Sequence, residues 1–176
     1  MEREPRSLSE SILGKEFVDV VMGAAQMNLA KDGELVPALF LQTQDDEQMV
    51  VVLENFPADG DEKRLYLASL GVALHSTGRR IDEAIFLSEV WYVEEEKEGE
   101  HLEARPSQHP QRREAIAVMG RDAQRSRLTH VLQPFHRDNQ NQPVFDKVAV
   151  AEYNVPAEQT PQAFGLVDYL FPASYG

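Results

Sequence analysis

The first quarter of the chain combines a helical pattern of apolar residues with a strand-like one. Spacings of i, i+4, i+7, i+8 and i+11 predict an amphipathic helix over about residues 8–30, with its apolar face formed by Leu13, Phe17, Val20, Val21 and Ala24. Ser7 and Glu10 make a capping-box pattern at its start. We expect the apolar face to pack against a sheet or a partner subunit.

A hairpin and a second helix are predicted next. Two apolar runs, 35–42 and 49–53, flank a polar segment and are typical of paired strands. Pro37 cannot donate a ladder hydrogen bond, so the start of the first run lies at an edge or before the pairing begins. The following helix is capped by Asp59 or Asp61. Its apolar positions have i, i+3, i+4, i+7 spacing and are Leu67, Leu70, Gly71 and Leu74.

The segment 84–93 is the most apolar ten-residue run and contains the only tryptophan. Because both of its faces are mainly apolar, it is predicted to be a central strand covered on both sides. Three further strands are predicted at 114–119, 128–135 and 144–153. Thr160 and Pro161 then begin a short helix that ends near Leu170.

This order of elements predicts an α+β fold, with an antiparallel sheet of about five to six strands. One helix is N-terminal, one lies between strands two and three, and a short one is C-terminal. The element order resembles that of profilin-like and roadblock-like domains. We expect a single globular domain over 1–176, with a flexible N-terminus at 1–6 and a long charged loop at 94–111 that is the most mobile internal segment.

Charge and composition restrict the class of partner. The chain has 17 basic and 30 acidic residues, a formal charge of −13, which disfavours nucleic-acid phosphate and anionic lipid. The absence of cysteine excludes disulfides and thiolate chemistry. No signal peptide and no apolar run of membrane-spanning length is present, so we expect a soluble cytoplasmic protein without nucleic-acid or membrane partners.

Glu89 is the one local inconsistency in the apolar segment. By strand parity it shares a face with Ile85, Leu87, Trp91 and Val93, so a carboxylate interrupts an apolar face. One interpretation is a structural ion pair with Arg113, Arg121 or His130. The other is a pocket in which Glu89 is a general base or ligand anchor together with His109 and Arg112.

The basic residues allow one further site. Six arginines lie between 105 and 127. They are expected to face acidic neighbours on adjacent strands, or to form an anion site from Arg112, Arg113 and Arg121. Histidine spacing does not support a metal site, and we expect no metal and no cofactor.

No motif specifies a reaction, so enzymatic and non-enzymatic functions both stay open. The first hypothesis is a small non-catalytic protein that acts by association, most simply as a homodimer through a sheet edge or the N-terminal helix. The alternative is an enzyme or small-ligand (anion) binder with a site under the 94–113 loop.

Overall fold

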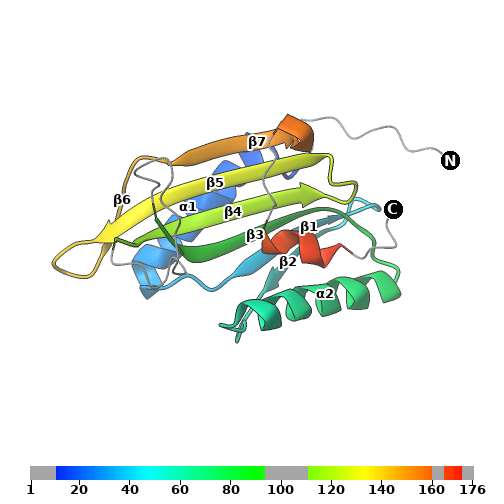
Figure 1. Ribbon diagram of the computed structural model, residues 1–176, viewed down its shortest axis with the longest axis horizontal. Helices are drawn as coiled ribbons and strands as arrows, with labels where there is room; N and C mark the ends of the chain where they lie inside the picture. Colours follow the sequence, from blue (N-terminus) through cyan, green and yellow to red (C-terminus); the bar gives the residue numbers. More distant parts are fainter. Residues whose placement is uncertain (1–10, 94–110, 160–164, 172–176) are drawn as a thin grey trace.

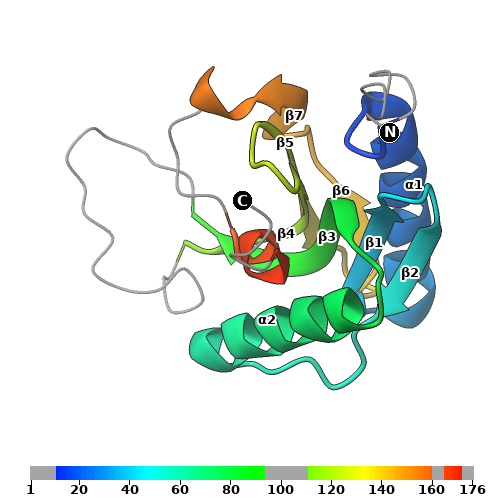
Figure 2. The same cartoon turned by 90° about the vertical axis from the view of Figure 1, so that its right-hand side faces the viewer.

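One antiparallel sheet forms the centre of the protein and carries a long helix on each face (Figure 1 and Figure 2). The computed structural model describes residues 11–93, 111–159 and 165–171. Its elements are α1 (Lys15–Asp32), β1 (Ala38–Thr43), β2 (Gln48–Val52), α2 (Gly60–Ser76), β3 (Ile81–Tyr92), β4 (Arg113–Asp122), β5 (Arg127–Arg137), β6 (Pro143–Phe145), β7 (Val150–Pro156) and the 3-10 helices η3 (Ala157–Gln159) and η4 (Leu166–Leu170). The predicted α+β class is confirmed.

The strand order is β2-β1-β3-β4-β5-β6, and β7 also pairs with β5. Strand β3 therefore lies inside the sheet, and its residues from Glu83 to Ser88 are buried. Ile85 and Leu87 belong to the core beneath α1, whereas Ala84 and Phe86 belong to the core beneath α2 and η4. The prediction of a central strand covered on both faces is confirmed for this part of β3.

Helix α1 differs from its predicted position. Residues 11–14 are not helical, and the helix begins at Lys15. The capping-box pattern falls on residues 7–10, outside the described part of the chain. The side chains that α1 buries are Val18, Val21, Met22, Ala25 and Leu29. Val20 and Ala24 are exposed, because two apolar stripes of the same period overlap in this sequence and the helix can bury only one of them.

The last predicted strand is interrupted by a bulge. Instead of one strand at 144–153, β6 and β7 both pair with β5. Asp146 N–H donates to the Pro134 carbonyl and Ala149 N–H donates to the Leu132 carbonyl, each at 2.9 Å. From the Phe135–Phe145 pair to the Leu132–Val150 pair, five residue steps on this chain face three on β5, which is two extra residues. Two extra residues leave the alternation of the two faces in phase, so the sequence indicated a continuous strand.

Helix α2 is capped and packed as its sequence predicts. Asp59 accepts hydrogen bonds from the backbone N–H groups of Asp61 (2.9 Å) and Glu62 (3.2 Å). Gly71 lies against η4, where a Cβ atom would be 2.0 Å from the Leu170 carbonyl oxygen. The predicted C-terminal helix is the short 3-10 helix η4, and its expected start at 160–161 is outside the described residues. No helix in the described ranges is long and apolar enough to cross a membrane.

Candidate functional sites

Strand β3 continues past the end of its ladder with β1. The last partners in that ladder are Ala38 and Leu87, whereas the ladder with β4 continues to Tyr92. Pro37, which precedes β1, has no N–H to donate to a ladder. Among the described residues, the segment 88–92 therefore has β4 on one side and no strand on the other.

The backbone N–H and C=O groups of Glu89 and Trp91 face this open edge. In an antiparallel sheet, successive residues direct these groups to opposite sides of the strand. The Asp82 carbonyl accepts a hydrogen bond from Ala123 N–H, on the β4 side (2.8 Å). The backbone N–H and C=O groups of even-numbered residues of β3 thus point toward β4. Those of odd-numbered residues point toward β1 or, beyond Leu87, toward the open edge.

A groove of about 640 Å³ adjoins the open edge. We call it the β3-edge groove; it is lined by Ala58, Asp59, Gly60, Asp61, Lys63, Arg64, Glu89, Val90, Trp91 and Glu114. The first turn of α2 and the last residues of β3 form its walls, and both lie toward the same end of the molecule (Figure 1). Four carboxylates and two basic side chains line it, so the groove is acidic.

Two glutamates beside the groove share one arginine. Arg137 Nε donates to Glu114 Oε2 (3.2 Å), and its Nη2 lies 3.6 Å from Glu89 Oε1. The same Nη2 donates to the Gly33 carbonyl at the end of α1 (2.9 Å). Glu89 Oε1 is buried and has no hydrogen-bond partner within the described part of the chain. Burial and the nearby Glu114 raise the pKa of Glu89, and Arg137 and the Leu35 backbone only partly oppose them.

The ion-pair partner of Glu89 is therefore Arg137, and not one of the three residues expected from the sequence. Glu89 is directly opposite Ile116 on β4 and lies on the α1 face. Arg113 and Arg121 are odd-numbered residues of β4 and so lie on the other face. His130 is opposite Met119 and lies on that other face too.

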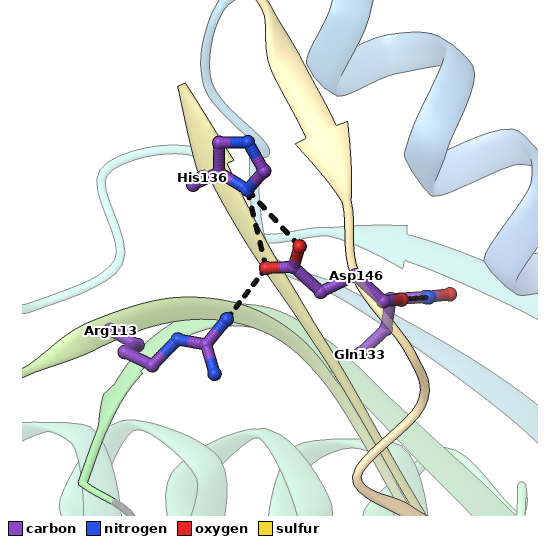
Figure 3. A network of polar contacts seen from close by, with 4 residues as sticks. All are labelled: Arg113, Gln133, His136 and Asp146. Atoms are coloured by element: carbon purple, nitrogen blue, oxygen red, sulfur yellow. Dashed lines mark hydrogen bonds and ion pairs between the residues drawn. The ribbon is translucent and has the colours of Figure 1, made fainter. Parts of the chain in front are cut away.

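On that other face, Arg113 belongs to a polar network (Figure 3). Its Nη2 donates to Asp146 Oδ2 (2.6 Å), and His136 Nδ1 lies 3.1 Å from Asp146 Oδ1. Gln133 Nε2 donates to the Asp146 carbonyl (2.7 Å). The Arg113 guanidinium also lies 6.0 Å from the Tyr92 ring centroid. An acidic neighbour therefore balances the charge of Arg113, as one of the two interpretations of the arginines expects.

The other predicted site residues are dispersed. The Arg112 guanidinium lies over the Trp91 ring, 4.8 Å from its centroid. Arg121 pairs with Asp168 at 2.9 Å, near the opposite end of β4 and about 27 Å from Arg113 by strand rise. His109 lies outside the described residues, as does most of the predicted charged loop at 94–111. The described residues contain no group of three or more His, Asp or Glu that could hold a metal ion.

Sequence reasoning missed Glu114, Arg137 and the first turn of α2. Glu114 could have been found, because it begins the strand that is predicted to pair with that of Glu89. The positions of Arg137 and α2 relative to Glu89 depend on strand register and helix docking, which one sequence does not encode locally.

A second surface is apolar and lies where β2 adjoins α1. Phe17 of α1 contacts Phe40 of β1 edge to face, with centroids 6.0 Å apart. Phe40 is directly opposite Val50 of the edge strand β2. Val20 lies on the same side of α1 as Phe17, one turn further along. We call this the α1–β2 surface; its most exposed members are Val20 (72%), Val50 (62%) and Val52 (55%).

Among the described residues, no strand pairs with the outer side of β2. Thr43 N–H donates to the Glu47 carbonyl (2.9 Å), so odd-numbered residues of β2 face β1. Gln48, Val50 and Val52 consequently direct their N–H and C=O groups outward. The strand Gln48–Val52 contains no charged residue and no proline.

Comparisons with known proteins give no family. No protein-family model, no curated protein and no solved structure matches this chain. The geometry of the β3-edge groove and of the α1–β2 surface is therefore what supports a function.

Proposed function

We propose that the protein acts by association and forms a homodimer through the outer edge of β2 and the adjoining α1–β2 surface. The observation that carries this proposal is an uncharged edge strand with two strongly exposed valines and an unpaired outer backbone. Edge strands of monomers are normally protected by charge, proline or a bulge. A strand without these protections is suited to pair with another strand.

A second copy of the chain fits this edge better than a charged partner. Antiparallel pairing about a two-fold axis near Val50 places Gln48 of one copy opposite Val52 of the other, and no like charges meet. The pairing also brings the Val50 and Val52 side chains of both copies together on the α1 face of a continuous sheet. Each copy thereby removes exposed apolar area from water.

The opposite edge of the sheet is protected. The bulge after β6 interrupts that edge, and prolines begin β6 and end β7. Glu152 of β7 adds a negative charge there. The contrast between the two edges is why we place the dimer contact at β2.

The test is the Val50→Lys variant. It places two ammonium groups close to each other across the two-fold axis, and the exposed side chain leaves the monomer fold intact. We expect the wild-type chain to sediment as a dimer and the variant as a monomer, with unchanged circular dichroism. Val72→Lys is the matched control, because Val72 is 57% exposed on α2. A monomeric wild type at high concentration, or a dimer that survives Val50→Lys, contradicts the proposal.

The alternative function is a ligand or catalytic site at the β3–β4 end of the sheet. The β3-edge groove and the raised pKa of Glu89 favour it. Its test is a thermal-shift screen with phosphates, nucleotides and divalent ions. A ligand-induced rise in the unfolding temperature supports this alternative if it is lost in the Glu89→Gln and Arg112→Gln variants but retained in Glu158→Gln.

A further inference from the structure

We propose that the β3-edge groove binds an extended basic segment of another protein, which pairs with β3 as an added strand in the position that β1 leaves vacant. This site is separate from the proposed dimer contact at β2. The guest strand runs antiparallel to β3, in line with β1. Its recognition combines backbone pairing with a positively charged side chain.

The backbone part of the argument rests on Glu89 and Trp91. Both residues direct their N–H and C=O groups toward the groove, and β3 is held rigidly there by its ladder with β4 up to Tyr92. A strand added at an open edge gains main-chain hydrogen bonds from a partner that is already in place. Among the described residues, the open edge spans only the end of β3 beyond Leu87, so it suits a segment of a few residues and not a long strand.

The charge of the groove selects a basic guest. Asp59, Asp61, Glu89 and Glu114 line it against Lys63 and Arg64, and Arg137 offsets part of the charge of the two glutamates. Arg64 is already paired with Asp61 at 3.1 Å. The whole chain, at −13, adds a field that attracts cations and repels nucleic-acid phosphate.

Glu89 specifies where the positive charge lies on the guest. Residues directly opposite one another in an antiparallel pair project their side chains to the same face. A lysine or arginine opposite Glu89 therefore projects to the α1 face, which is the face on which the partly exposed Glu89 side chain lies. Two residues away on the guest, an apolar or aromatic side chain reaches Trp91, whose ring is partly exposed.

A second copy of this chain fits the groove less well than a basic segment. Antiparallel self-pairing of residues 89–91 brings two copies of Glu89 and Glu114 close together, and both copies carry the same acidic field. Like charges across strands destabilise such a pair. The guest is therefore a segment of a different protein.

The experiment uses short fluorescent peptides and the full chain. In the probe peptide, lysine and tyrosine take turns at every second position, with valine between them, so that a lysine opposite Glu89 places a tyrosine opposite Trp91. One control replaces each lysine by glutamate, and another keeps the lysines but carries N-methyl groups on the amides that would pair with β3. Trp91, the only tryptophan, reports occupancy of the groove through its emission. We expect the basic peptide to bind and shift this emission, and both controls to bind at least about tenfold more weakly.

Two variants of the protein separate the site from general charge attraction. Glu89→Gln should weaken binding of the basic peptide about three- to tenfold. Glu158→Gln removes the same charge near the opposite end of the sheet and should leave binding unchanged. Val50→Lys should not alter binding in the groove. The proposal is overturned if no peptide binds, if N-methylation has no effect, or if Glu89→Gln and Glu158→Gln weaken binding equally.

Discussion

At the scale of single residues, the surroundings of Glu89 disfavour ionisation of its carboxyl group. One guanidinium serves two carboxylates, and it lies closer to Glu114 than to Glu89. Burial removes water that would otherwise stabilise the Glu89 charge. The folded protein therefore holds the Glu89 proton more tightly than the unfolded chain does, and ionisation of Glu89 costs stability at neutral pH.

Glu89→Gln should accordingly leave the free energy of unfolding unchanged at pH 7 or raise it by up to about 1 kcal/mol. The benefit should fade as the pH falls below the ordinary glutamate pKa of 4.5, where the wild-type residue is protonated in both states. Urea unfolding of both proteins at several pH values measures this difference in the free energy of unfolding.

Arg137→Gln is to be compared with Glu89→Gln, because it leaves Glu89 and Glu114 without their shared cation. It should lower the free energy of unfolding by about 1 to 3 kcal/mol. Combining it with Glu89→Gln should restore part of that loss. A large loss of stability in Glu89→Gln alone would show that the carboxylate is a stabilising partner of Arg137.

The sequence reveals the anomaly at Glu89 but not its resolution. Strand parity places Glu89 correctly on the face of Ile85 and Leu87. The same parity argument, applied to β4, excludes Arg113 and Arg121 as partners once the register is known. Register is set by cross-strand packing over the whole sheet, so Arg137 could not be identified from local sequence.

At the scale of elements, α1 and the β1–β2 hairpin together determine which apolar side chains stay exposed. The helix buries the stripe that contains Val18 and Val21 and leaves Val20 outside. Phe17 lies at the boundary, half-buried against Phe40. The existence of this helix and of the hairpin was predictable from periodicity and turn residues. Which stripe would be buried was not, because both stripes have the helical period and only tertiary packing distinguishes them.

Phe17→Ala should destabilise the protein by about 1 to 3 kcal/mol, less than the loss for a fully buried phenylalanine. The loss arises from the edge-to-face contact with Phe40 and from the apolar area that Phe17 covers. Chemical denaturation measures it, and Val20→Ala, at a strongly exposed position, should change stability by less than about 0.5 kcal/mol. A loss above about 4 kcal/mol for Phe17→Ala would place that side chain fully inside the core.

At the scale of the whole molecule, the sheet consists of two blocks of sequence neighbours. Strands β1 and β2 form one hairpin. Strands β3, β4 and β5 form a meander, and β6 and β7 each pair with the outer side of β5. Only the pairing of β1 with β3 joins strands that α2 separates. The element order along the chain was predictable, whereas this single non-local junction follows from burying both faces of β3.

That junction has a consequence for the order of events in folding. Pairing Phe40 with Ile85 must close a loop that contains β2 and all of α2, whereas β4 meets β3 and β5 through single connections along the chain. The meander should consequently be formed in the transition state, and the β1–β2 hairpin should dock after the barrier. In stopped-flow experiments, Ile116→Val in β4 should slow refolding, and Val51→Ala in β2 should mainly accelerate unfolding. The hairpin that carries the proposed dimer contact is then the last part of the sheet to form and the first to detach, so its edge is available for assembly only once the rest of the chain has folded.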